Sequence, residues 1–254
     1  MGDPLKALKL GFVLGWQDIR QIYRRSSLGQ LWITLGMAIT IASVGVVFGQ
    51  ILNLPARDYL PFLASGIVLW NFLSNTIIDG SNAFIYAESL IKQLPVPKVA
   101  FIFRAVAKNL FTLAHNILLV PLTIVLFGAP INFAMLVFPI GLLIATLTVA
   151  CVITPIAIFS ARFRDLPPIV SSVMGVAFYI TPVLWKPESL SSESAHLLLG
   201  LNPIYHLLQI MRLPLLGKLP TVENWGLSLM ALAIGLVTAT FIFKKFSKQI
   251  AYWV

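Results

Sequence analysis

The residues of this chain that could carry bond-making chemistry are few and widely separated. His115, His196 and His206 are the three histidines, and no H-E-x-x-H pattern is present to bring two of them to one metal ion. The phosphate-binding pattern G-x-x-x-x-G-K-[ST] is also absent, since Gly217-Lys218 lacks the upstream glycine and is followed by leucine. The sequence therefore predicts neither a metal site nor a nucleotide site in this chain.

The positions of the acidic residues argue against transport driven by protons or other ions. All nine Asp and Glu residues lie outside the long apolar runs. A proton- or ion-coupled transporter is expected to carry acidic groups inside its membrane spans. We therefore expect no cofactor here, and an energy source on another molecule, most simply a separate cytoplasmic ATPase that binds ATP and Mg²⁺.

Residues 83–98, AFIYAESLIKQLPVPK, combine charge, apolar side chains and prolines at a spacing suited to docking. Glu88 and Lys92 stand four residues apart and can pair along one helix face. The PVP sequence ends the helix and fixes its exit direction. We predict that this short amphipathic helix is the element on which the ATPase docks. The alternative is that it anchors the chain in the membrane interface. Its apolar ridge consists of Leu90, Ile91 and Leu94.

Aromatic residues are candidates to line a substrate pathway. Sugar rings have apolar C–H faces that stack on aromatic side chains, so a channel for a glycan would use such residues. For each of them, packing between helices is the alternative. The candidates are Trp70, Phe72, Phe178 and Tyr179 within predicted spans, Trp185 at a span end, and Tyr205 in the connection that follows.

The composition predicts that these residues are positioned by membrane helices. Only 11% of the 254 residues are charged and 58% are hydrophobic, with a mean hydropathy of +0.90. A soluble domain has about 25% charged residues, so most of this surface faces lipid. The net charge of +9 would suggest nucleic acid in a soluble protein, but here the cations flank apolar runs, and we expect no nucleic acid.

Six segments are long and apolar enough to span a bilayer. A hydrocarbon core of about 30 Å needs about 20 apolar residues in a helix. We therefore expect an all-α integral membrane protein with six transmembrane helices. The predicted spans are Leu31–Leu52, Leu60–Ile78, Asn109–Phe127, Phe133–Phe159, Leu166–Trp185 and Gly226–Phe243.

The distribution of Lys and Arg predicts the orientation, because cytoplasmic connections are enriched in these residues. Fourteen lie on the side that holds both ends of the chain, and four lie on the other side. Both termini are therefore predicted to be cytoplasmic. The four on the external side are Arg57, Lys186, Arg212 and Lys218.

The connection between the fifth and sixth spans contains an apolar stretch that is too broken to span. Residues 195–217 are interrupted at Gly200 and at Asn202-Pro203, leaving two pieces of about one to two turns each. Irregular backbone at membrane depth is tolerated only where protein or a cavity surrounds it. The stretch predicts a short external re-entrant hairpin, with a helix pair lying flat on the outer surface as the alternative.

The first thirty residues predict an amphipathic helix. Phe12, Trp16, Ile19 and Tyr23 recur at intervals of four, three and four and line one helix face. We expect this helix to lie in the membrane interface with its aromatic face towards lipid.

Several stretches in order resemble ABC-2 type permeases, closest to the membrane subunits of bacterial polysaccharide ABC exporters and, among these, to the O-antigen exporters. The resemblance extends over essentially the whole chain. The stretches are QDIRQIYRRSSLGQLW, ESLIKQLPVPK, RFRDLPPIVSSVMGVAFYITPVLW, LNPIYHLLQIMR and the terminal IAYWV.

This resemblance implies a homodimer of permeases in the bacterial cytoplasmic membrane, paired with two ABC ATPase subunits. The implied substrate is an undecaprenyl-linked polysaccharide, and the chain itself is implied to be a transporter subunit rather than an enzyme. It further implies a coupling helix at Glu88–Pro97 and external gate helices at LNPIYHLLQIMR. The N-terminal helix with Arg20, Arg24 and Arg25 would brace the junction with the ATPase.

The predicted organisation is a single transmembrane domain over residues 1–254. Its parts are the interface helix (1–30), spans one to five (31–185), the external segment with the hairpin (186–225), and span six with the cytoplasmic tail (226–254). Three alternatives stay open: an exporter of capsule or teichoic acid polymer, an exporter of a drug or lipid, and a membrane-embedded enzyme of glycan assembly. The absence of acidic residues in the spans disfavours the enzyme.

Overall fold

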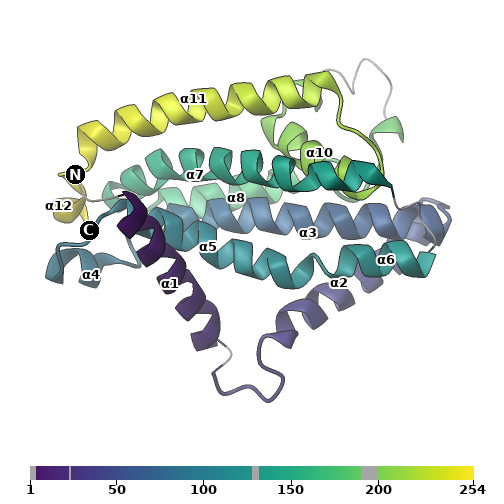
Figure 1. Cartoon of the computed structure of the whole chain (residues 1–254), viewed down its shortest axis with the longest axis horizontal. Coiled ribbons are helices and arrows are strands. Elements are labelled where there is room, and N and C mark those ends of the chain that lie inside the picture. Colours follow the sequence, from purple (N-terminus) through teal and green to yellow (C-terminus); the bar gives the residue numbers. More distant parts are fainter. Residues whose placement is uncertain (1–3, 23, 128–131, 190–198) are drawn as a thin grey trace.

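The structure is a computed structural model that describes residues 4–22, 24–127, 132–189 and 199–254. All regular secondary structure in these residues is helical, as Figure 1 shows, which confirms the all-α class. The elements are α1 (Pro4–Ile22), α2 (Leu31–Ile51), α3 (Ala56–Ser81), α4 (Glu88–Gln93), α5 (Val99–Asn116), α6 (Leu119–Phe127), the 3₁₀ turn η1 (Phe133–Val137), α7 (Phe138–Arg162), α8 (Leu166–Ile180), the 3₁₀ turn η2 (Pro187–Ser189), α10 (Pro203–Leu215), α11 (Val222–Phe246) and α12 (Ile250–Trp253).

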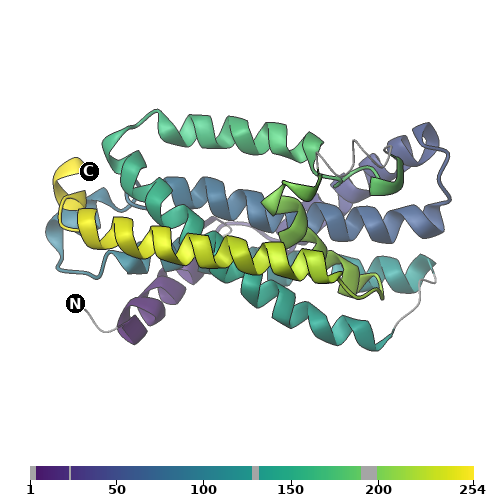
Figure 2. The same ribbon diagram turned by 90° about the horizontal axis from the view of Figure 1, so that it is seen from above.

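Most of the long helices run along the long axis of the molecule, with α3 in the centre, whereas α1 and α2 slope away from this axis to a turn below the bundle (Figures 1 and 2). In the most apolar 18 residues of α3, 78% are buried, whereas only 11% are buried in the corresponding parts of α2 and α11. The apolar surfaces of α2 and α11 therefore need lipid or another chain to cover them. Short elements mark the two ends of the bundle: α4 and α12 lie at one end, and α10 lies towards the other (Figure 1). We refer to these as the α4 end and the α10 end.

Five helical stretches are long and apolar enough to cross a membrane among the described residues. Two of these stretches each consist of two consecutive elements: α5 and α6 form one, and η1 and α7 form the other. A multi-pass membrane protein is thereby confirmed. The five stretches are Leu31–Ile51, Ala56–Ser81, Val99–Phe127, Phe133–Arg162 and Val222–Phe246.

The predicted fifth span, Leu166–Trp185, is helical only over the 15 residues of α8. At 1.5 Å per residue, a helix of this length extends for about 22 Å, which is less than the hydrocarbon thickness of about 30 Å. The helix ends because Thr181 precedes Pro182 and adopts an extended conformation, as residues before proline do. The length predicted for this span was therefore wrong.

The segment between α3 and α6 is also arranged differently from the prediction. The helical spacing of residues 83–94 predicted one helix, but only Glu88–Gln93 form α4, and the residues from Asn82 to Ala87 form turns. Leu94 is extended before Pro95, so the prolines do end the helix as predicted. After them, α5 begins at Val99, ten residues before the predicted start of the third span.

The predicted pair of short external helices is described only in its second half. That half is the 13-residue helix α10, which is longer than the one to two turns expected. Asn202 begins it, because its side chain accepts hydrogen bonds from the backbone N–H groups of Ile204 and Tyr205. Most of the first half lies in residues 190–198, outside the described residues.

Helix α1 packs along the first half of α5 rather than presenting one aromatic face to lipid. Its contact stripe is spaced by four residues. An added Cβ at Gly15 would lie 2.8 Å from the backbone nitrogen of Lys108, and one at Gly11 would lie 2.8 Å from the carbonyl oxygen of Ala100. Glycines spaced by four let two helix backbones approach closely. The buried stripe consists of Ala7, Gly11, Gly15 and Ile19.

Ile19 was assigned to the lipid-facing side, and that assignment was wrong, because its side chain is buried. The rings of Phe12 and Trp16 remain about 40% exposed and meet Phe111 of α5 edge-on, at centroid distances of 5.9 and 5.1 Å. Tyr23, the last member of the predicted face, lies outside the described residues. The helix itself was correctly predicted, but the face that packs is the one with small side chains.

Candidate functional site

The α4 helix has an inner and an outer side. Ile91 is 9% exposed and belongs to the same apolar core as Ile250 and Val254 at the end of the chain. Helix α12 lies beside α4, so the C-terminal residues support it from within the protein. By contrast, Leu94 is 51% exposed. The apolar ridge of Leu90, Ile91 and Leu94 is therefore divided, because Ile91 belongs to the chain's own core and Leu94 faces outward.

A charge network covers the outer side of α4. The Lys92 ammonium donates to Glu88 Oε1 at 2.7 Å, as the four-residue spacing predicts, and Arg164 Nη2 lies 3.8 Å from Glu88 Oε2. The hydrogen bond from Lys92 and the positive charges of Lys92 and Arg164 lower the pKa of Glu88. Arg164 belongs to the turn between α7 and α8, so this network joins α4 to a second pair of helices.

Two further ion pairs hold α1 and α3 against α5. Arg104 donates to both carboxylate oxygens of Asp18, at 2.7 and 2.6 Å, which is a bidentate pair. The Asp79 carboxylate of α3 accepts from Lys108 at 2.9 Å and from Asn109 at 2.8 Å. These contacts were not predicted. Glycines at positions 11 and 15 were the sequence signal that could have indicated the close approach of α1 and α5.

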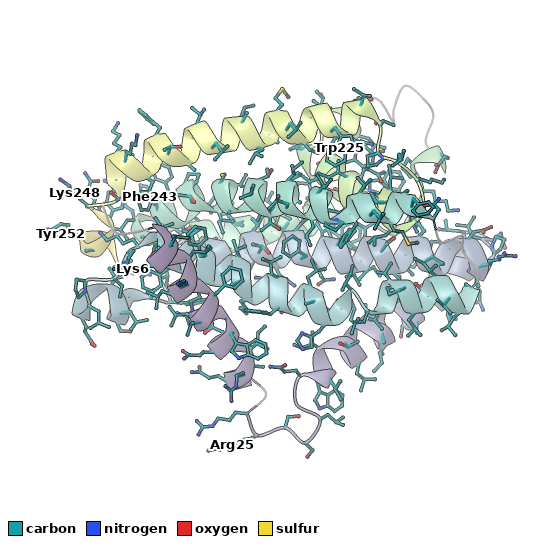
Figure 3. All side chains as sticks on the ribbon, in the orientation of Figure 1. Lys6, Arg25, Trp225, Phe243, Lys248 and Tyr252 are labelled. Atoms are coloured by element: carbon teal, nitrogen blue, oxygen red, sulfur yellow. The ribbon has the colours of Figure 1, made fainter. Side chains whose placement is uncertain are left out.

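Arg20, Arg24 and Arg25 are exposed. Figure 3 shows Arg25 at the turn between α1 and α2, below the bundle, whereas Lys248 and Tyr252 lie beside α12 at the α4 end. The structure thus places Arg25 away from the α4 end. The residues that we assigned to ATPase coupling form two distinct surfaces.

Four of the six aromatic pathway candidates come together, and two do not join them. The rings of Trp70 and Phe178 lie 5.7 Å apart, those of Phe178 and Tyr179 lie 5.4 Å apart, and Trp185 Nε1 donates to the carbonyl oxygen of Tyr179 at 3.2 Å. Along this row the exposed fraction changes from 5% at Trp70 to 73% at Tyr179. The row leads from the core of the bundle to its surface. Phe72 is buried within α3.

Tyr205, the sixth candidate, lies in a cavity at the α10 end. Beside it, His206 bonds through its ring nitrogens to Asn224 Oδ1 at 2.9 Å and to the carbonyl oxygen of Gly200 at 3.1 Å. These bonds attach α10 to the start of α11. Among the described residues, no group of three or more His, Cys, Asp or Glu side chains could hold a metal ion.

Comparisons with known proteins identify the family of this chain. The sequence model of the ABC-2 type transporter family matches residues 10–216. The O-antigen export system permease protein RfbA of Myxococcus xanthus is 29% identical over 200 residues, which cover 76% of this chain and 74% of that protein. Two proteins of the same name from Klebsiella pneumoniae are 22% identical over 195 residues and 21% identical over 215 residues. The first match covers 74% of this chain and 73% of the relative, and the second covers 78% and 80%.

Proposed function

Because the chain belongs to the ABC-2 type transporter family, we propose that it is the permease subunit of an ATP-driven exporter of O-antigen polysaccharide in a bacterial cytoplasmic membrane. The observation that carries this proposal is the similarity over about three quarters of the chain to three permeases named for O-antigen export. Members of this family act as transporter subunits and not as enzymes. The proposed substrate is the polysaccharide on its undecaprenyl carrier.

The α4 end is proposed to be cytoplasmic, with α8 as a sixth, short span. The charge count supports this orientation, because fourteen Lys and Arg residues lie on the predicted cytoplasmic side of the membrane and four lie on the external side. The segment from Thr181 to Leu184 extends α8 towards the α10 end, where Tyr59 donates to the carbonyl oxygen of Leu184 at 2.8 Å. In this arrangement α10 is the described half of an external re-entrant hairpin.

Cysteine labelling in a Cys151→Ser background tests the orientation. Leu219 is 68% exposed near the α10 end, and Tyr252 is 86% exposed at the α4 end. We expect Leu219→Cys to react with an impermeant thiol reagent in intact spheroplasts and Tyr252→Cys to react only after permeabilisation. Labelling of Tyr252→Cys in intact spheroplasts would contradict the proposed orientation.

The partner ATPase, which would bind ATP and Mg²⁺, is proposed to dock on the outer side of α4. A docked element needs a rigid backbone and an accessible surface, and α4 has both. Ile91 and the supporting α12 hold it from within, while Leu94 and the Glu88–Lys92 pair remain accessible. Two permeases and two ATPases are the proposed assembly.

The aromatic row is proposed to contact the passing glycan where two permeases meet. Tyr179 and its neighbours on α8 expose apolar surface that lipid, a second permease or the substrate must cover. Tyr179→Ala removes an exposed ring and is expected to lower export without lowering stability. Trp70→Ala removes a buried ring and is expected to lower both, because emptying a buried aromatic site costs about 3–5 kcal/mol.

A deletion strain tests the function itself. Loss of this chain should cause undecaprenyl-linked O-antigen to accumulate inside the cell, and the wild-type chain should restore surface O-antigen while co-purifying with an ABC ATPase. Normal surface O-antigen in the deletion strain would refute the proposed substrate. Failure to recover any ATPase with a functional permease would refute the proposed energy source.

A further inference from the structure

The α10 end contains a cavity of about 750 Å³, within the size range of ligand-binding pockets. It lies between the start of α3, the segment around η2, helix α10 and the chain that leads into α11. Charged and polar side chains line it together with apolar ones. The residues that carry the argument are Arg57, Lys186, Arg212, Lys218, Gln209 and Glu188.

Cations outnumber carboxylates among the described residues that line this cavity. Four cationic side chains line it, against the two carboxylates of Asp58 and Glu188. These four cations are all of the Lys and Arg residues that the charge count places on this side of the membrane. A concentration of positive charge at a concave surface favours an anionic ligand.

Arg212 is the central residue of this site. It is 1% exposed, its Nη1 donates to the carbonyl oxygen of Pro182 at 2.7 Å, and its guanidinium carbon lies 4.3 Å from the centre of the Phe62 ring. Contact with the ring occupies one face of the guanidinium and leaves the in-plane N–H groups for acceptors. Arg212 Nε has no hydrogen-bond partner. A buried arginine donor without an acceptor is costly unless an acceptor arrives from outside the chain.

A second unpartnered atom indicates the kind of ligand. Gln209 stands three residues before Arg212 on α10, is 4% exposed, and its Oε1 has no partner. This atom accepts hydrogen bonds, so its complement is a hydroxyl or amide donor. The two residues together fit a ligand that offers anionic oxygens to the arginine and a hydroxyl group to the glutamine.

We propose that this cavity binds a phosphate group that carries neighbouring hydroxyl groups, at the outer surface of the membrane. The planar guanidinium group of arginine can donate two parallel hydrogen bonds to phosphate oxygens. The surrounding lysines act as point charges that attract the phosphate from any direction. A phosphoglycerol lipid headgroup and a soluble sugar or glycerol phosphate share this chemistry. Its place at the outer surface rests on the proposed orientation, but binding requires neither the ATPase nor the exported polymer.

The experiment measures the thermal unfolding midpoint of the purified full-length chain in neutral detergent, with added ligands. The probes are phosphatidylglycerol, phosphatidylcholine, glycerol 1-phosphate and inorganic phosphate. We expect phosphatidylglycerol or glycerol 1-phosphate to raise the midpoint more than phosphatidylcholine does. A response to the lipid alone identifies a headgroup site, and a response to glycerol 1-phosphate identifies a soluble phosphate site.

Charge variants separate this site from general attraction to anionic lipid. Lys218 is exposed at the rim, so Lys218→Gln should fold normally and weaken binding by about threefold, the effect of one screened charge. Glu188→Gln removes an opposing carboxylate and should strengthen binding by a similar factor. Lys244→Gln, an exposed change at the α4 end, is the matched control and should leave binding unchanged.

The variants also define the results that overturn the proposal. Equal binding to Lys218→Gln, Glu188→Gln and Lys244→Gln would show that the cavity charges do not contact the ligand. Equal responses to phosphatidylglycerol and phosphatidylcholine, without a response to glycerol 1-phosphate, would show that no phosphate site of this kind exists. Arg212→Lys keeps the charge but loses the planar donor group, and it should weaken binding more than Lys218→Gln does.

Discussion

The two ends of this molecule use charged side chains in opposite ways. At the α4 end, carboxylates and cations pair with one another, and the Glu88–Lys92–Arg164 network and the Asp18–Arg104 pair join one helix to the next. At the α10 end, the described residues that line a cavity include four cations and two carboxylates. Paired charges define the position of helices, whereas a majority of cations at a cavity favours an anionic ligand. In our proposals, the first end transmits force and the second receives an anion.

The largest expected effect concerns the inner side of α4. Ile91→Asp places a charge in the core next to Ile250 and Val254, and an unpaired buried charge costs about 3–5 kcal/mol. We expect a lower unfolding midpoint, loss of export, and a disordered α4. Leu94→Asp is the matched change at an exposed position and should leave the midpoint unchanged.

These two variants distinguish a residue that holds α4 in the protein core from one that contacts the ATPase. Leu94→Asp should reduce co-purification of the ATPase and reduce export, because the charge lies on the accessible side. If Leu94→Asp retains both at wild-type level, α4 is a membrane anchor and force must reach the permease elsewhere.

The next effect concerns the packing that builds the α10 end. A Cβ added to Gly141 of α7 would lie 2.3 Å from the carbonyl oxygen of Ile210 in α10. The clash is with backbone, so Gly141→Ala should push α10 outward and lower stability by about 1–3 kcal/mol. Gly175→Ala on α8 meets nothing within 4 Å and should be neutral or slightly stabilising, since alanine favours helix. A neutral Gly141→Ala would mean that α10 is not fixed through α7.

A smaller effect is expected from the ion pair that joins α1 to α5. The Asp18 and Arg104 side chains are only 20% and 26% exposed, and their pair is bidentate. A double-mutant cycle with Asp18→Asn and Arg104→Gln should give a coupling free energy of about 1 kcal/mol from the unfolding midpoints. The corresponding cycle at the α10 end, with Glu188→Gln and Lys218→Gln, should give a coupling near zero. Equal coupling free energies in the two cycles would contradict the difference that we propose between the two ends.

The smallest effect depends on pH. Because its neighbours lower the pKa of Glu88, this carboxylate favours the folded arrangement above its ordinary pKa. That contribution is lost as the pH falls through the lowered pKa of the folded state. The protection of residues 88–93 against hydrogen exchange, after correction for the intrinsic pH dependence of amide exchange, should therefore decrease at acidic pH in the wild type. Glu88→Gln should remove this decrease in protection. An identical pH profile in both proteins would show that the network does not hold α4.

Sequence patterns predicted elements better than they predicted contacts. Prolines ended α4 where expected, because a residue before proline avoids helical backbone angles. The same rule applied at Thr181-Pro182 would have shortened the predicted fifth span. The face of α1 was assigned from its large side chains, although the packed face is the one with glycines, where two backbones approach. The row of Trp70, Phe178 and Tyr179 was proposed as separate candidates, and only the structure brought their rings together.

The sequence by itself determined that this is an all-helical membrane protein of the ABC-2 type transporter family. Those properties follow from local composition and from motifs in order, which need no knowledge of distance. The tertiary structure decided which side of α4 is accessible and where Arg212 lies. It also decided that Arg57, Lys186 and Lys218 surround the same cavity as Arg212. Arg57 and Lys218 are separated by more than 150 residues of chain. Only the packing of α3, α10 and the start of α11 brings them together, because charge interactions depend on separation in space and not along the chain.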